Sequence, residues 1–306
     1  MFILILQQLL IMLFIMVLGF ICYKLRLVTQ EGNKMCSNLL LLVITPTIVL
    51  LVSQADYNPV FARNLVIAFA AAVGSHIIAI VAARIVIPKK NNPEYAVESF
   101  CCVYSNSAFM GIPLIYSVLG NEGVFYLSAY IVTFNLLAWT HGVGLMKGSF
   151  SLKYLKEGIL SPVILSVIVT IPMYFMQIKI PPLLLDAMEL VSNLMTPLAM
   201  LVAGFSLAQV DLKTVLKKRE LYRTNLVKLI IMPVLTLLVL ARLPIDRHVI
   251  YAILIASACP AAVSAALMPM RFGKNYKLGT EIFVFSTVLS LLTLPIMVLL
   301  AGYLIG

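Results

Sequence analysis

The fold of this chain is decided by residues 104–119, YSNSAFMGIPLIYSVL, which are apolar enough to lie in a bilayer yet interrupt their own helix. The polar and helix-breaking residues of this stretch are Ser105, Asn106, Ser107, Gly111 and Pro113. Proline lacks an N–H and its ring collides with the carbonyl four residues earlier, so we expect the helix to break or kink at Pro113. Unpaired backbone in hydrocarbon is tolerated only where it is buried in protein or lines a wet cavity. The stretch therefore predicts two half-helices that meet at a binding site, as in membrane transporters.

Composition places the whole chain in the membrane. The 306 residues are 62% hydrophobic and 11% charged, whereas a soluble domain carries about 25% charged residues. The first 21 residues hold no charge, and Lys24 and Arg26 follow this apolar run instead of preceding it, so we expect a retained span and not a cleaved signal. The net charge of +10 is explained by loop charges that set topology. Nucleic acid is therefore not an expected partner.

Hydropathy and helix-breaking residues predict an all-α polytopic membrane protein with ten spans. Short polar connections separate most of the spans, so residues 1–306 form a single membrane domain. The spans cover approximately residues 2–23, 35–53, 64–87, 97–119, 122–146, 157–177, 183–208, 221–241, 248–270 and 278–304.

The basic residues lie mainly on one side of these spans. Cytoplasmic loops hold the excess of lysine and arginine, and here the loops after spans 1, 3, 5, 7 and 9 hold 17 of the 22. The opposite side holds only Arg63, Lys179, Arg242 and Arg247, and Lys228 alone falls inside a span. Both termini are therefore predicted on the extracytoplasmic side of a cell membrane.

Short motifs recur at a common offset, which indicates an internal repeat. The recurring motifs are Ser37-Asn-Leu and Ser192-Asn-Leu, Thr45-Pro and Thr196-Pro, Asn64-Leu-Val and Asn225-Leu-Val, and the glutamates Glu122 and Glu281, which each begin an aromatic-rich span. Every pair is 151 to 161 residues apart. We therefore predict two five-span repeats, about residues 1–147 and 157–306. Because five is odd, the second repeat must be inverted relative to the first.

The repeat predicts that span 9 mirrors span 4, and span 9 does contain a breaker, Pro260, within residues 257–264, SACPAAVS. Two broken helices that cross near the bilayer midplane would present free N–H groups and positive dipole ends. Such a site suits an anion, typically a carboxylate. The alternative is that these prolines only kink their helices.

Several stretches resemble the auxin efflux carrier family and its bacterial members, which are described as malate or malonate permeases. The resemblance covers nearly the whole chain and is carried by residues 106–114, NSAFMGIPL, the break at Pro260, residues 272–276, FGKNY, and Leu294-Pro295. It implies a ten-helix inverted-repeat fold shared with bile-acid symporters and sodium–proton antiporters. In that fold spans 1, 2, 6 and 7 form a scaffold that can make a homodimer, and spans 3–5 and 8–10 form a moving core.

The resemblance also implies a function and roles for the crossover residues. The expected substrate is a small organic anion such as malate, malonate or an auxin-like acid. Plant members carry a long hydrophilic loop where this chain has only residues 147–157, which argues against auxin itself. Asn106 would donate its amide N–H to a carboxylate, with Ser105 and Ser107 as lesser contacts. Gly111 would allow a close backbone approach, and Pro113 would fix the break.

The facing half of the crossover is expected to be Cys259, Pro260, Ala261 and Ala262, whose small side chains leave room for a ligand. Lys228 could balance an anionic substrate, because a cation within a span is a functional hypothesis by default. It lies about one turn from a positive loop, so snorkelling to the surface is the favoured alternative.

Other polar residues carry weaker hypotheses. His76 and His141 lie inside spans 3 and 5 and could relay protons, although histidines satisfied by a neighbouring helix are the more common case. Asn135 in span 5 either takes part in such a relay or bonds across helices. Glu98 and Glu122 border span 4 and are expected to be solvated.

The coupling ion stays open at this point. No carboxylate lies within residues 104–113 or 257–264, so sodium binding through Asp or Glu is unsupported. Backbone carbonyls or a protonated substrate could still couple transport to sodium or protons.

The five cysteines show no metal-ligand spacing, and neither a metal nor a cofactor is expected. A membrane enzyme is disfavoured because no His-Glu-x-x-His or Gly-x-Ser-Gly motif occurs. A sensor without transport is the remaining alternative class.

Overall fold

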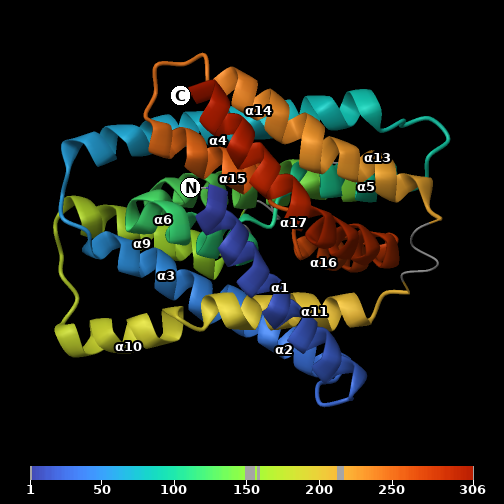
Figure 1. The fold of residues 1–306 in the computed structure, drawn as a ribbon, viewed down its shortest axis with the longest axis horizontal. Helices are drawn as coiled ribbons and strands as arrows, with labels where there is room; N and C mark the ends of the chain where they lie inside the picture. Colours follow the sequence, from blue (N-terminus) through green and yellow to red (C-terminus); the bar gives the residue numbers. More distant parts are fainter. Residues whose placement is uncertain (1, 149–155, 157–158, 212–216, 306) are drawn as a thin grey trace.

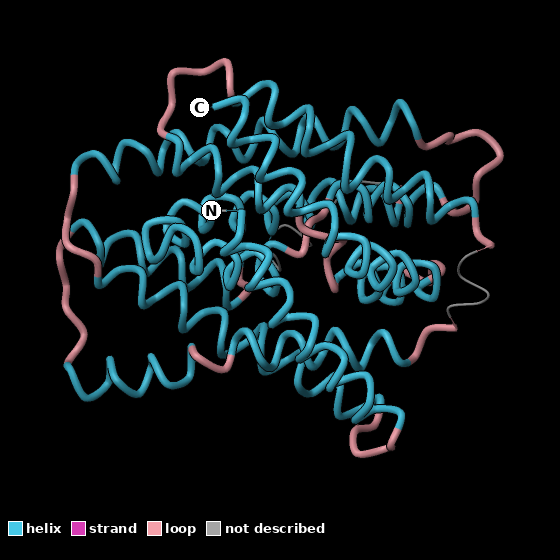
Figure 2. The backbone as a smooth tube through the Cα atoms, viewed as in Figure 1, coloured by secondary structure: helices cyan, strands magenta, loops and turns pink. Residues whose placement is uncertain are grey.

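A computed structural model describes residues 2–148, 156, 159–211 and 217–305. Lys153 and Lys213 of the basic loops, and residues 157–158 of the sixth predicted span, lie outside these ranges. Within the described residues every regular element is a helix, and the helices are joined by short loops (Figures 1 and 2). The prediction of an all-α protein is confirmed for this part of the chain.

The described elements are α-helices, short π-helical turns (η1, η3, η4 and η5) and one 3-10 turn (η2). In chain order they are α1 (Phe2–Lys24), α2 (Gln30–Leu39), η1 (Leu40–Ile44), α3 (Thr45–Leu51), η2 (Val52–Gln54), α4 (Pro59–Val86), α5 (Tyr95–Val103), η3 (Ser107–Gly111), α6 (Ile112–Leu137), η4 (Ala138–Gly142), α7 (Val143–Lys147), α9 (Pro162–Phe175), α10 (Pro182–Ser192), α11 (Met195–Ala208), α13 (Arg219–Leu226), η5 (Val227–Ile231), α14 (Met232–Leu240), α15 (Arg247–Ala258), α16 (Ser264–Arg271) and α17 (Tyr276–Ile305).

Seven continuous stretches of the described chain are long and apolar enough to cross a membrane. They are Leu4–Lys24, Gln30–Gln54, Pro59–Val86, Ser107–Lys147, Pro182–Ala208, Arg219–Leu240 and Tyr276–Ile305. Two shorter apolar helices, α9 and α15, accompany them. These stretches make the chain a multi-pass membrane protein.

The longest stretch, Ser107–Lys147, contains a sharp turn at Gly120. Its 41 residues would extend about 60 Å as one straight helix, which is twice the roughly 30 Å of a hydrocarbon core. At Gly120 the backbone has φ 60° and ψ −153°, a conformation that a residue with a Cβ rarely adopts. The chain therefore changes direction between predicted spans 4 and 5, where the sequence analysis places their boundary.

Three π-helical turns, η1, η3 and η5, each end two residues before a proline: Pro46, Pro113 and Pro233. In an α-helix the proline ring collides with the carbonyl of the residue four positions before it, and proline has no N–H to donate to that carbonyl. A π-helical turn is wider, so it moves this carbonyl away from the ring and does not require the hydrogen bond. The helix consequently continues through Pro113. Of the break or kink predicted at Pro113, the break is wrong, because the helix is interrupted seven to nine residues earlier, at residues 104–106.

Helices from the two halves of the sequence pack together in two groups. In the first group α1 runs across α11, and α3 packs against α9 and α10 (Figure 1). In the second group α4, α6, α14, α15 and α17 contact one another, with α5 and α13 beside them. Buried apolar residues form two large clusters, and both clusters include residues beside the interruptions in spans 4 and 9.

Two glycines allow α1 and α11 to approach closely. A Cβ on Gly204 would overlap the backbone carbonyl of Met16, and a Cβ on Gly19 would overlap that of Leu201. Helices in lipid gain association energy mainly from such close packing of small residues. The two glycines therefore set the distance between these helices.

Gly204→Val is expected to destabilise the protein because its side chain would push α1 away from α11. We expect the melting temperature of the detergent-purified protein to fall by about 5 °C or more, since overpacking typically costs about 1–3 kcal/mol. Gly74→Val is the matched control, because a Cβ on Gly74 meets no atom within 4 Å. Equal melting temperatures for the two variants would contradict a close crossing.

Candidate functional site

The interruptions of spans 4 and 9 meet as two short extended segments. The Asn106 N–H donates to the Pro260 carbonyl over 2.7 Å, and the Ala262 N–H donates to the Tyr104 carbonyl over 2.9 Å. Ser105 and Ala261 form an antiparallel bridge between these bonds. Both interruptions are thus present, and they pair directly with each other. Paired backbone groups allow non-helical chain to lie at this depth.

A cavity of about 550 Å³ opens beside the paired segments. It is bordered by both interruptions, by span 5 and by residues of spans 2 and 6. Five predicted site residues line it: Ser105, Asn106, Ser107, Asn135 and Ala262. Their contact with a substrate stays a prediction, but the structure brings residues more than 150 positions apart to one surface.

Polar groups in the cavity wall lack protein partners. Asn106 is 6% exposed and lines the cavity, and its side-chain amide makes no hydrogen bond with another described residue. The buried Ser264 hydroxyl is also unpaired. The first N–H groups of a helix have no acceptor within that helix, and those of Ser107 and Ala108 meet no other backbone acceptor in the described chain. Buried polar groups normally pair, so these point to a ligand or water as their partner.

The remaining cavity wall is mostly apolar. It includes Phe109, Phe134, Trp139, Leu267 and Met268. Such walls with a few convergent polar groups are typical of small-molecule sites. The cavity therefore combines a polar end at the crossover with an apolar body.

The cavity also contains a cation that the sequence analysis did not select. The Arg271 guanidinium lies 5.2 Å from the ring centroid of Trp139, and both residues line the cavity. In the sequence, Arg271 is one of the basic residues in the loop after span 9. Its position directly after the second broken helix, together with the one tryptophan of the chain in span 5, was the available signal.

The other predicted crossover residues lie behind the cavity wall. Cys259, Pro260 and Ala261 are buried in or next to the paired segment, and Pro113 is buried in the first turn of α6. A Cβ on Gly111 would lie 3.5 Å from the Cys259 sulfur, which is an ordinary contact. The predicted close approach of the Gly111 backbone to a substrate stays a prediction, because this contact involves protein atoms alone.

Lys228 does not reach the membrane surface. Its side chain is fully buried, and Nζ donates to the Ser105 hydroxyl and, over 3.1 Å, to the Ser257 carbonyl. The favoured prediction of snorkelling is wrong, because η5 turns this side chain toward the crossover and not toward the basic loop. Lys228 is also absent from the cavity lining, so Ser105 separates it from the cavity.

The two candidate relay histidines belong to aromatic contacts around the crossover. His76 is fully buried, pairs through Nδ1 with the Ala72 carbonyl at 2.8 Å and lies 4.5 Å from the Tyr130 ring. His141 Nδ1 lies 3.1 Å from the Tyr104 hydroxyl. Neither residue lines the cavity. The amide of Asn135 donates to Ile131 in its own helix over 2.8 Å, so the predicted bond across helices is not formed.

Glu98 is buried and paired, which contradicts its predicted solvation. Its side chain is 0% exposed, and Arg223 binds both carboxylate oxygens. Asn92 donates to the same carboxylate over 2.9 Å and Thr224 over 3.2 Å. The network joins the start of α5 to α13. Sequence position alone did not reveal it, because the partner is 125 residues away.

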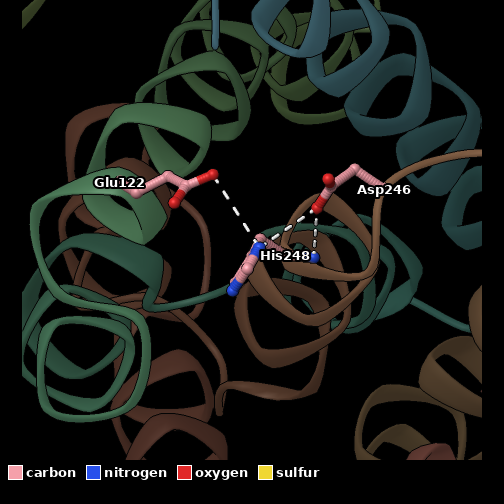
Figure 3. A group of neighbouring side chains, drawn as sticks. All are labelled: Glu122, Asp246 and His248. Atoms are coloured by element: carbon pink, nitrogen blue, oxygen red, sulfur yellow. Dashed lines mark hydrogen bonds and ion pairs between the residues drawn. The ribbon is translucent and has the colours of Figure 1, made fainter. Parts of the chain in front are cut away.

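Glu122 belongs to a second polar cluster, at the beginning of α15 (Figure 3). His248 Nδ1 lies 3.8 Å from Glu122 and 3.2 Å from Asp246, and Asp246 caps α15 by accepting from the His248 N–H over 2.7 Å. Tyr126 donates to Glu122 over 2.9 Å. The three ligand-type side chains are close enough to hold a metal ion, but the capping of α15 by Asp246 and the hydrogen bond from Tyr126 to Glu122 account for their arrangement.

Comparison with known proteins assigns the family. The sequence model of a family described as membrane transport protein matches residues 4–151 and 148–298, which together span nearly the whole chain. Among curated proteins, none matches it. The family comprises transporters of the auxin efflux carrier-like type and not enzymes. With its multi-pass helices, its paired interruptions and this match, the chain belongs to the membrane transport protein family.

Proposed function

We propose that this transporter carries a small organic anion through the cavity beside the crossover. The observation that carries the proposal is the unpartnered Asn106 amide, held at the cavity wall beside helix N–H groups without acceptors. Amide and backbone N–H donors at a helix start match a carboxylate. Asn106 would donate to the carboxylate, while Ser107 and Ser264 would complete its hydrogen bonds.

The cavity walls favour a carboxylate with an apolar body over a compact dicarboxylate. Phe134 and Trp139 face the same space as Asn106, and apolar surface gains free energy when it leaves water. Malate and malonate have no apolar group large enough to cover this apolar wall of the cavity. An aromatic or aliphatic monocarboxylate is therefore the preferred substrate class, and the two dicarboxylates are its comparators.

The proposed mechanism is alternating access in a ten-span inverted repeat. Spans 4 and 9 are discontinuous, the turn at Gly120 divides one long stretch between spans 4 and 5, and α9 is a short helix. Ten spans are therefore compatible with the seven long stretches. The helices α1, α2, α3, α9, α10 and α11 pack mainly with one another, which supports a scaffold of spans 1, 2, 6 and 7. Movement of the remaining spans would expose the cavity to each side in turn.

The membrane arrangement is part of the same proposal. The distribution of basic residues supports a cell membrane location with both termini on the extracytoplasmic side. A homodimer through the scaffold rests on the family resemblance. The exposed leucines of α10, Leu183 at 84% and Leu190 at 71%, supply an apolar face for lipid or a second copy.

Uptake by proteoliposomes tests the proposal. Purified protein is reconstituted, and uptake of radiolabelled indole-3-acetate, benzoate, malate and malonate is compared with that of protein-free liposomes. We expect saturable uptake of at least one carboxylate, and stronger competition by the aromatic monocarboxylates than by the dicarboxylates. The same ligands should raise the melting temperature, because they bind the folded state. Absence of both uptake and stabilisation across the panel would overturn the proposal.

A further inference from the structure

Lys228 places a buried ammonium group where the first halves of both broken helices end. It donates to the Ser105 hydroxyl, just beyond the end of α5, and to the Ser257 carbonyl in the last turn of α15. The last carbonyls of a helix have no partner within it and carry the negative end of the helix dipole. The ammonium therefore lies at two negative helix ends, opposite to the N–H groups that border the cavity.

This cation has no carboxylate partner in the described chain. The ion pairs found there involve Lys179, Lys218, Arg223 and His248, and none involves Lys228. The nearby carboxylate of Glu98 is bound by Arg223. A buried ammonium is costly unless it is compensated. For Lys228 the compensation comes from a carbonyl, a hydroxyl and, 3.6 Å away, the Met232 sulfur.

Helix-end carbonyls and unwound backbone are the groups that hold coupling cations in transporters with broken helices. We propose that the Lys228 ammonium is a tethered cation that takes the place of a soluble coupling cation at the crossover. The inference rests on the proposed function, since it gives the crossover its role in transport. It makes Lys228 a positioning residue, which acts through Ser105 on the cavity.

Ser105 is the link between the two sides of the crossover. Its hydroxyl accepts from Lys228, lies 3.1 Å from the Tyr130 hydroxyl and donates to the Ser257 carbonyl over 3.2 Å, and Ser105 also lines the cavity. Loss of the ammonium would leave Ser105 and Ser257 facing an empty space. A sodium ion or a small alkylammonium ion in that space would supply the missing charge.

The first test replaces cations in the uptake assay. Wild-type uptake is measured with equal concentrations of sodium, potassium or N-methyl-D-glucamine chloride on both sides. Because Lys228 already supplies the cation at the crossover, transport should not require a soluble one. We therefore expect the uptake rates in the three salts to agree within about twofold. A wild-type rate that requires sodium would overturn the inference while leaving carboxylate transport intact.

The second test compares two substitutions of the same residue. Lys228→Ala removes the ammonium and leaves room, whereas Lys228→Met removes the ammonium but fills the space with an apolar chain of similar length. In N-methyl-D-glucamine we expect both variants to transport about tenfold more slowly than wild type. Sodium or methylammonium should restore Lys228→Ala by about fivefold and should leave Lys228→Met unchanged. Equal rates of Lys228→Ala in all buffers would overturn the inference.

A stability measurement separates this inference from the proposed function. Sodium or methylammonium is titrated into detergent-purified protein with potassium-free buffer, and the melting temperature is recorded. We expect a rise of about 3 °C or more for Lys228→Ala and none for wild type or Lys228→Met, because a ligand stabilises only the state that binds it. This outcome needs no transported substrate. Its absence would refute the tethered cation even if carboxylate uptake is strong.

Discussion

Asn106→Ala is expected to lower the uptake of the carboxylate substrate about 10- to 100-fold, since a hydrogen bond to a charged group contributes about 1.5–3 kcal/mol. The amide lines the cavity and has no protein partner among the described residues, so its removal should cost the protein little stability. The measurement is initial uptake into proteoliposomes, together with the melting temperature in detergent. We expect the second quantity to change by about 2 °C or less.

Asn135→Ala is the matched control for this prediction. Asn135 lines the same cavity, but its amide already donates to Ile131 in its own helix. We expect uptake to fall by about threefold at most, since no donor aimed at the ligand is lost. Equal losses in the two variants, or unchanged uptake in Asn106→Ala, would show that Asn106 does not bind the substrate.

Arg223→Ala is expected to cause the largest loss of stability. It leaves the Glu98 carboxylate, which is 0% exposed, with only Asn92 and Thr224 as donors. Removing one partner of a buried ion pair typically costs about 3–5 kcal/mol, which corresponds to a fall in melting temperature of about 10 °C. Thermal unfolding in detergent, followed by size-exclusion chromatography of heated samples, measures the change.

Two further variants identify the cause of that loss. Adding Glu98→Gln to Arg223→Ala removes the stranded charge and should recover part of the melting temperature. Lys179→Ala breaks the ion pair with Asp56, whose side chain is 99% exposed, and should change the melting temperature by about 2 °C or less, because exposed pairs contribute little. If Arg223→Ala behaves like Lys179→Ala, the Glu98 network does not stabilise the fold.

The sequence predicted those features that depend on local chemistry. Apolar runs of span length and the breaker Pro260 follow from rules about single residues and their neighbours. The same rules placed the first break at Pro113, whereas the chain accommodates that proline by the widened turn η3 and unwinds at residues 104–106 instead. Local rules identify strain in a helix but do not choose between the ways of relieving it.

Features that depend on long-range packing were beyond sequence reasoning. Lys228 was predicted to snorkel because its sequence neighbours are basic, yet its partners Ser105 and Ser257 come from two other spans. Glu98 was predicted to be solvated because it lies near a span end, yet Arg223 covers it. The direction of a side chain on a helix depends on which helices surround it, and one sequence without contacts does not give that arrangement.

The pair of backbone bonds between residues 104–106 and 260–262 has a consequence for how the protein can move. Sliding one broken helix past the other would break both bonds, and in the core of a bilayer no water would replace them. We therefore expect the two interrupted helices to move together in any conformational change. The donors of these bonds are the main-chain N–H groups of Asn106 and Ala262, so proline is the one residue type that would uncouple the two halves at either position.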